Sequence, residues 1–109
     1  MILIDTPLHR ASWSGHADVV SLLVEQGALV NAPDADGSTA LHYAAWNGKA
    51  RCAELLLRAG ASVRCRDKLG CTPLHRAAME GHAECAFVLL NLGAVDAATV
   101  TNQDMGALG

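Results

Sequence analysis

The chain has 109 residues, which is enough for one domain, and its formal net charge of −3 gives no electrostatic case for binding nucleic acid. Apolar residues make up 51% of the chain and aromatic residues only 4%, and this alanine-rich composition favours closely packed helices over a barrel or a sandwich. No apolar stretch approaches the roughly 18 residues that a membrane span requires, so we expect no membrane partner.

The first predicted element begins in TPLHRASWSGH, residues 6–16. The same pattern returns as TALHYAAWNGK at 39–49 and as TPLHRAAMEGH at 72–82, so equivalent residues are 33 positions apart. A threonine suited to cap a helix opens each copy, and a glycine suited to end one closes it. Each copy therefore predicts a short helix between these residues: Thr6, Thr39 and Thr72 at the start, and Gly15, Gly48 and Gly81 at the end.

A second helix is predicted after each of these glycines, because apolar residues recur at helical spacing in ADVVSLLVEQG, ARCAELLLRAG and AECAFVLLNLG. Cys52 and Cys85 share one position with Val19, and we expect them to pack there as small core side chains. The leucines and valine of these helices should supply most of the core: Leu22, Leu23, Leu55, Leu56, Val88 and Leu89.

Turn sequences separate the helix pairs, PDADGS at 33–38 and RDKLGC at 66–71. Aspartate stands at the first position of a type I turn in both, and glycine stands at the fourth. We expect both segments to form the tips of short hairpins that project from the stack, and we call them the first tip and the second tip.

TPLHRA, TALHYAA and TPLHRAA resemble the ankyrin signature T-P-L-H-x-A, and 33 residues is the ankyrin period. The resemblance extends from Thr6 to about Ala98. It implies an all-α fold, an ankyrin-repeat solenoid of stacked antiparallel helix pairs with short β-hairpin or turn tips. It divides the chain into a first repeat at 1–33 that lacks its leading hairpin, repeats at 34–66 and 67–99, and a segment at 100–109 that is a degenerate start of a further repeat or a disordered tail.

One such unit cannot bury its apolar faces alone, and roughly three repeats are the minimum for independent stability. The ends of this array do not read as polar capping repeats, since Phe87 and Leu92 are apolar where earlier copies have Ser21 and Glu54, or Gln26 and Ala59. Two interpretations stay open. The chain is an excerpt of a longer array, or it self-associates through an uncapped end.

Five histidines and four cysteines raise the question of a metal or catalytic site. His9, His42 and His75 are equivalent residues, expected on the order of 9 Å apart, which is too far to share a metal with bonds of about 2 Å. The sequence has no Cys-x-x-Cys pair and no catalytic motif. We expect no metal, no cofactor and no enzyme activity, and the resemblance implies that these histidines bond to backbone groups beside the turns.

The resemblance also implies that partners contact the concave surface of the first helices and the hairpin tips. Trp13, Trp46 and Met79 would form a ridge there, about 20 Å long because each inter-repeat step is roughly 10 Å. Alternatively, the indoles only cover the alanine-rich helices and the core. The expected partner-binding residues are Arg10, Trp13, Ser14, Ala35, Asp36, Ser38, Tyr43, Trp46, Asn47, Lys68, Leu69, Cys71, Arg76, Met79 and Glu80.

The sequence thus predicts a non-catalytic protein–protein interaction module that binds a peptide segment or a helix. The alternative is a set of internal spacer repeats of a larger scaffold protein, which would self-associate or domain-swap when isolated. The start of the chain shows no secretory signal, and four cysteines without such a signal indicate a reducing compartment, the cytoplasm or the nucleus.

Overall fold

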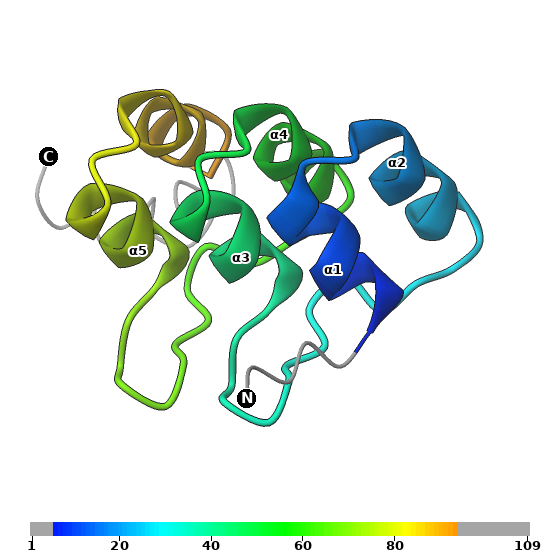
Figure 1. The fold of residues 1–109 in the computed structure, drawn as a ribbon, viewed down its shortest axis with the longest axis horizontal. Helices are drawn as coiled ribbons and strands as arrows, with labels where there is room; N and C mark the ends of the chain where they lie inside the picture. Colours follow the sequence, from blue (N-terminus) through cyan, green and yellow to red (C-terminus); the bar gives the residue numbers. More distant parts are fainter. Residues whose placement is uncertain (1–5, 94–109) are drawn as a thin grey trace, which may run out of the picture.

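The computed structural model describes residues 6–93. The pairs of helices stand in a row, with the first helix of each pair at the front and the tips below (Figure 1). The described part contains no β-strand, and none of its helices is long and apolar enough to cross a membrane. The predicted all-helical stack is confirmed: α1 (Pro7–Ser14), α2 (Ala17–Glu25), α3 (Ala40–Trp46), α4 (Ala50–Arg58), α5 (Pro73–Met79) and a further helical segment at 83–93.

The first helices begin and end as the sequence predicts. In each one, the threonine Oγ1 accepts the backbone N–H of the histidine three residues on, at 3.1 Å for His9, 3.4 Å for His42 and 3.3 Å for His75. Left-handed glycines, which turn the chain directly into the second helix, follow these helices: Gly15, Gly48 and Gly81.

The histidines of α1 and α3 bond to the tip that follows each helix. The Thr39 N–H donates to Nδ1 of His42 over 3.1 Å, so Nδ1 is unprotonated and Nε2 carries the hydrogen. Nε2 of His42 donates to the carbonyl oxygen of Cys71 over 2.8 Å, and Nε2 of His9 donates to the carbonyl oxygen of Ser38 over 3.1 Å. The structural role that the resemblance implies for these two imidazoles is therefore confirmed.

The tips are tight turns built on aspartate. The Asp34 carboxylate accepts the backbone N–H of Asp36 over 2.8 Å, and the Gly37 N–H donates to the Asp34 carbonyl over 3.0 Å. Asp67 organises the second tip in the same way. The two tips also contact each other, because the backbone N–H of Lys68 donates to the carbonyl of Asp36 and the two side chains form an ion pair, both over 2.9 Å.

The core lies between successive pairs and consists largely of small side chains. Cys52 and Cys85 are buried in it, as predicted. Leu22 was expected there too, but this prediction is wrong, since the side chain is 54% exposed. Its equivalent Leu55 faces α2, whereas no described helix packs on the outer side of α2 itself. The other predicted core leucines and valine are buried or pack against the core: Leu23, Leu55, Leu56, Val88 and Leu89.

Ser12 departs from this apolar pattern. Its side chain is fully buried in α1, and its hydroxyl has no hydrogen-bond partner among the described residues. The equivalent residues are Ala45 and Ala78. An unsatisfied buried hydroxyl costs free energy that an alanine methyl group does not.

We expect Ser12→Ala to raise the free energy of unfolding by about 1 kcal/mol, measured by urea denaturation, because it removes that unpaired hydroxyl. Ser14→Ala is the control, since Ser14 lies on the same helix but is exposed. A loss of stability in Ser12→Ala greater than in the control would show that the hydroxyl has a partner in solution.

His42 should make stability depend on pH. Burial lowers the pKa of His42 below its ordinary value of 6.5. Below about pH 6.5, His42 binds a proton more readily in the unfolded chain than in the folded chain. The stability that the neutral His42 ring contributes is therefore complete above this pH and decreases as the pH falls toward the lowered pKa of the folded state. Between about pH 7.5 and about pH 5, His42→Gln should lose less stability than the parent chain.

The control for this experiment is His75→Gln, because His75 is the equivalent residue but is exposed. Its urea midpoint should follow the pH dependence of the parent. If the two variants have the same pH dependence, burial of the His42 ring does not control it.

Candidate partner-binding surface

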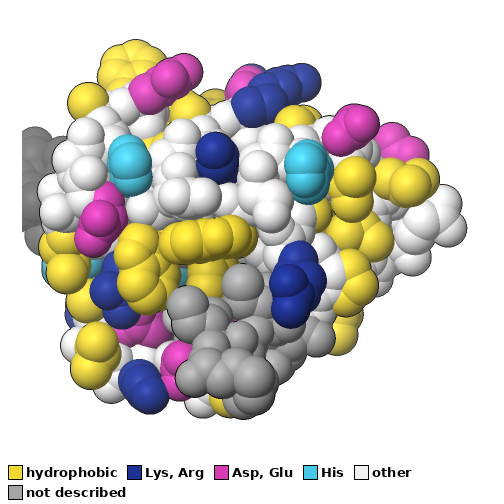
Figure 2. Space-filling view, in the orientation of Figure 1, with side chains coloured by type: hydrophobic (Ala, Val, Ile, Leu, Met, Phe, Trp, Pro, Cys, Tyr) yellow, Lys and Arg dark blue, Asp and Glu magenta, His cyan; other side chains and the backbone are white. Residues whose placement is uncertain are grey.

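The front of the stack consists of α1, α3, α5 and the two tips, and we call it the first-helix face. Figure 2 shows hydrophobic side chains gathered near its middle, with basic and acidic side chains around them. Of the predicted partner-binding residues, seven are exposed: Arg10, Ser14, Ala35, Lys68, Leu69, Met79 and Glu80. Five are partly exposed: Trp13, Asp36, Trp46, Asn47 and Cys71. Three are buried: Ser38, Tyr43 and Arg76.

Trp13, Tyr43 and Trp46 pack together, and we call them the aromatic cluster. The rings of Tyr43 and Trp46 are nearly parallel, at 6° with centroids 6.2 Å apart. Trp13 meets both edge to face, with centroid distances of 6.0 Å to Tyr43 and 5.9 Å to Trp46. The indoles are thus in contact instead of one roughly 10 Å step apart, because an edge-to-face pair contributes about 0.5–1.5 kcal/mol beyond the area it buries.

Tyr43 anchors this cluster to the first tip. Its ring is buried, and its hydroxyl donates a hydrogen bond to the Asp34 carboxylate. Burial and that hydrogen bond raise the pKa of Tyr43, so the hydroxyl stays protonated. Burial alone would raise the pKa of Asp34, but the bonds from Tyr43 and from the backbone N–H of Ser38 outweigh burial and lower it. The tip carboxylate is therefore ionised and holds the tyrosine in place.

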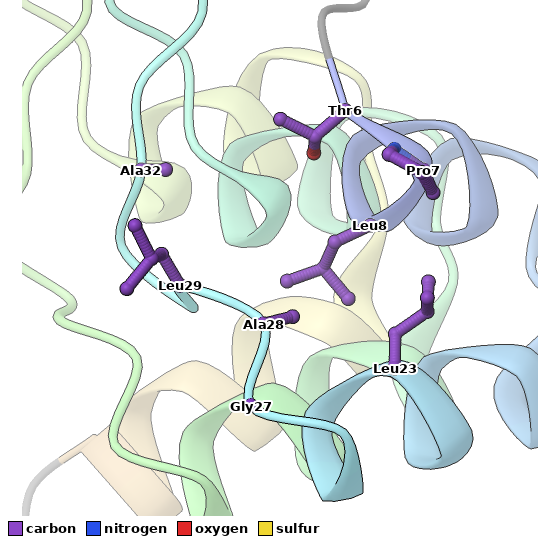
Figure 3. Close-up of a pocket in the computed structure, with 8 residues that line it drawn as sticks. All are labelled: Thr6, Pro7, Leu8, Leu23, Gly27, Ala28, Leu29 and Ala32. Carbon is purple, nitrogen blue, oxygen red and sulfur yellow. The ribbon is translucent and has the colours of Figure 1, made fainter.

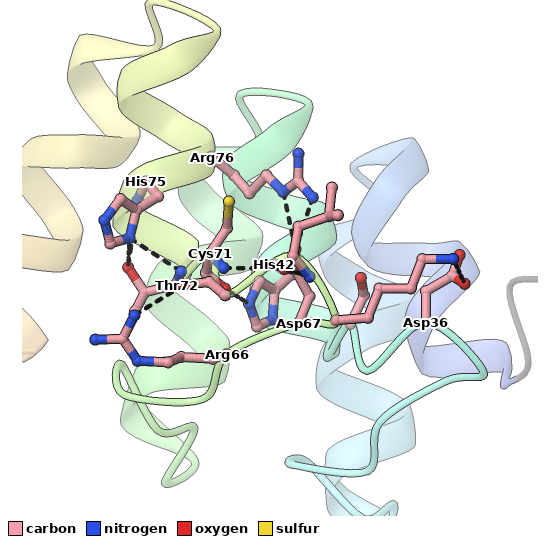
Figure 4. Close-up of polar contacts among 12 residues, drawn as sticks. Asp36, His42, Arg66, Asp67, Cys71, Thr72, His75 and Arg76 are labelled. Atoms are coloured by element: carbon pink, nitrogen blue, oxygen red, sulfur yellow. Dashed lines mark hydrogen bonds and ion pairs between the residues drawn. The ribbon is translucent and has the colours of Figure 1, made fainter.

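Arg76 anchors the other side of the cluster to the second tip (Figure 4). Its Nε and Nη2 atoms lie 3.0 Å and 2.7 Å from Oδ2 of Asp67, and the exposed fractions of the two side chains are 10% and 2%. The guanidinium carbon lies 4.2 Å from the centroid of the Trp46 ring. Burial opposes ionisation of Asp67, but the Cys71 N–H and Arg76 bonds lower its pKa below the ordinary value. The buried Asp67–Arg76 ion pair thus holds the guanidinium in place against one face of the Trp46 indole.

The turn sequences predict the place of Asp34 and Asp67 in the tips but do not connect them with the aromatic residues. The signal is a spacing: each aspartate stands nine residues before a side chain that can donate to it, Tyr43 in one copy and Arg76 in the next. A second polar contact was also missed, because the side-chain amide of Asn47 donates to the carbonyl oxygen of Trp13 over 2.7 Å.

A second surface feature lies at the α1–α2 end of the row (Figure 3). It is a partly open cavity of about 350 Å³ between the start of α1, the inner side of α2 and the chain that leaves α2. Its lining is almost entirely apolar: Thr6, Pro7, Leu8, Leu23, Gly27, Ala28, Leu29 and Ala32. Polar groups able to orient a small ligand are scarce there, so this cavity suits apolar side chains better.

In residues 6–93, no group of three or more His, Cys, Asp or Glu side chains is arranged so that it could hold a metal ion. Burial raises the pKa of the Cys52 thiol, and it raises that of Cys85 to about 11. Both thiols therefore stay protonated near neutral pH, the form that is a poor nucleophile and a poor metal ligand.

Comparison with known proteins identifies the unit. The family model for ankyrin repeats, which itself describes three copies, matches this chain over residues 4–67 and again over residues 30–104. The chain belongs to the ankyrin repeat family. An ankyrin repeat protein of Rickettsia bellii (strain RML369-C) is 53% identical to it over 36 residues, which are 33% of this chain and 15% of that protein.

A solved ankyrin repeat structure is also similar to this chain. The crystal structure of the human ASB11 ankyrin repeat domain resembles this chain with a TM-score of 0.78 and 37% sequence identity. The match covers 82% of this ankyrin chain and 40% of that one. The chain thus spans less than half the length of either relative.

The Asp67–Arg76 pair should be essential for the stability of the second tip. We expect Asp67→Asn to lower the free energy of unfolding by about 2–3 kcal/mol, because it leaves a buried guanidinium without its counter-charge. Urea denaturation measures the change. Asp36→Asn, which breaks the exposed pair with Lys68, is the control and should have little effect. Equal effects in the two variants would mean that solvent screens the Arg76 pair as well.

Proposed function

We propose that this chain is a non-catalytic protein–protein interaction module that binds a peptide segment or a helix of another protein on the first-helix face. Ankyrin repeats generally serve as protein–protein interaction modules, and this chain belongs to that family. The observation that carries the proposal is the aromatic cluster, because Trp13 and Trp46 remain partly exposed although a partner-independent core would bury them. Tryptophan, tyrosine and arginine are the residues that most often dominate binding energy at interfaces.

The anchoring of the cluster supports this proposal further. Tyr43 and Arg76 are buried and held by the tip carboxylates, so the indole of Trp46 is packed between groups that are already in place. A surface fixed before binding loses little conformational entropy when a partner docks. The exposed side chains of Met79 and Leu69, at 62% and 71%, would extend the apolar contact toward α5 and the second tip.

A second candidate function is that of internal spacer repeats of a larger scaffold, which self-associate when isolated. The observation that favours it is the α1–α2 end, where Val19 and Leu22 on α2 and Leu29 in the lining of the apolar cavity are 40%, 54% and 79% exposed. Sedimentation separates the two candidates. Concentration-dependent association that Leu22→Ser abolishes supports the spacer, and a monomer at all concentrations argues against it.

We also place the protein in a reducing compartment, the cytoplasm or the nucleus. The buried thiols of Cys52 and Cys85 pack as apolar side chains, a use of cysteine that suits such a compartment. A fluorescent fusion of the natural protein found in a secretory compartment would contradict this assignment.

We expect Trp13→Ala combined with Trp46→Ala to weaken partner binding at least about tenfold, because it removes both exposed indoles from the first-helix face. The measurement is the affinity for peptides that the parent chain selects from a displayed random library. Phe87→Ala is the control, since it removes an aromatic side chain that is 65% exposed on another helix.

Circular dichroism must show that each variant is folded at the temperature of the binding measurement. If the double variant binds the selected peptides like the parent but unfolds at a much lower temperature, the indoles only cover the core.

A further inference from the structure

The charges of the first-helix face are almost all neutralised within the face itself. Arg76 is paired with Asp67 and is buried. Lys68 is paired with Asp36 across the two tips. The Asp34 carboxylate is buried, and its oxygens accept bonds from Tyr43 and from backbone N–H groups.

Arg66 also belongs to the second tip; it is exposed, and its guanidinium donates to the carbonyl oxygen of Gly70. Apart from Arg66, two charged residues of the face remain. Arg10 on α1 and Glu80 after α5 are both exposed, and neither has an ion-pair partner among residues 6–93. They stand in the first and third copies of the repeat, so two inter-repeat steps of about 10 Å place them about 20 Å apart. In the order of the row, Tyr43 and Trp46 of α3 lie between them. Trp13 shares α1 with Arg10 and meets Trp46, and Met79 directly precedes Glu80.

We propose that this face selects an extended partner segment with a fixed order of charge: an acidic side chain at Arg10, apolar side chains over the aromatic cluster, and a basic side chain at Glu80. This inference rests on the proposed function and specifies the chemistry of its ligand. An extended chain advances about 3.3 Å per residue, so the acidic and basic residues should be about six positions apart. Complementary charges contribute to specificity and register more than to affinity.

The repeat positions show why the two charges can discriminate. Arg10 is equivalent to Tyr43 and Arg76, of which one is neutral and the other is neutralised by Asp67. Glu80 is equivalent to the uncharged Ser14 and Asn47. Each row of equivalent residues therefore presents one uncompensated charge, and the two charges stand at opposite ends of the face and have opposite sign.

The test uses three seven-residue peptides with blocked ends and the same leucine- and serine-containing centre. Their end residues are aspartate and lysine, two aspartates, or two lysines. A peptide with two aspartates or two lysines presents the same charge at both ends of the face. The comparison therefore does not depend on the direction in which a peptide lies along the face. The two tryptophans of the chain both lie in the aromatic cluster, so intrinsic fluorescence reports binding without a label.

The parent chain should bind the aspartate–lysine peptide up to about fivefold more tightly than the other two, the range expected of an exposed ion pair. Arg10→Glu should bind the two-lysine peptide best, and Glu80→Lys should bind the two-aspartate peptide best. These preferences should shrink at about 0.5 M salt, where charges are screened.

Two control variants make the same charge changes away from the face. Arg64→Glu and Glu25→Lys alter exposed residues and should keep the order of preference of the parent. If all three peptides bind alike to the parent, Arg10→Glu and Glu80→Lys, and Trp46→Ala abolishes binding, the charge order is wrong and the proposed function stands. If the parent binds none of the peptides, both proposals are wrong for extended segments.

Discussion

The hydrogen bonds from the imidazoles of α1 and α3 to the tips that follow them are the contacts on which the rest of the front surface depends. His9 and His42 each lie in one helix and donate to a carbonyl that precedes the next helix, over 3.1 Å and 2.8 Å. For His42 the geometry requires a neutral ring, since its Nδ1 accepts a backbone N–H. Because each bond crosses from one unit to the next, it sets the distance and the orientation at which successive helix pairs meet.

The tips then position the aromatic cluster. Each tip is held against the preceding helix, and its aspartate projects back toward the first helix of its own unit, where it accepts from Tyr43 or Arg76. The cluster thus combines residues of α1 and α3, with Arg76 of α5 against it, and the stack alone would bring these side chains near one another but would not orient them. A buried ion pair of this kind gives little net stability over apolar packing, so its value here is orientation of the indole.

Much of this arrangement could be predicted from the sequence. The helix caps, the turn glycines and the burial of Cys52 and Cys85 follow from local rules applied to residues that recur at a fixed interval. The repeated sequence does not encode where in the stack a residue lies. Leu22 and Leu55 are equivalent residues with similar side chains, yet only Leu55 has a neighbouring helix on its outer side.

The candidate surface was harder to predict than the fold, because a list of residues on one face does not say which of them are exposed. Tyr43 and Arg76 were expected to contact a partner, but the structure buries both against tip carboxylates that are nine residues earlier in the chain. The direction in which Trp13 and Trp46 lean depends on ring–ring contacts between units, which no single-residue rule supplies.

The row of helix pairs has a mechanical consequence. Among helices α1–α5, substantial contacts run only within a pair or to the adjacent pair, as in α1 with α3 and α3 with α5, so each of these junctions resists separation independently of more distant ones. Under tension along the row, we expect the helix pairs to peel off one after another. The chain would then lengthen in successive increments of one 33-residue module, as an elastic element does, instead of rupturing in a single event.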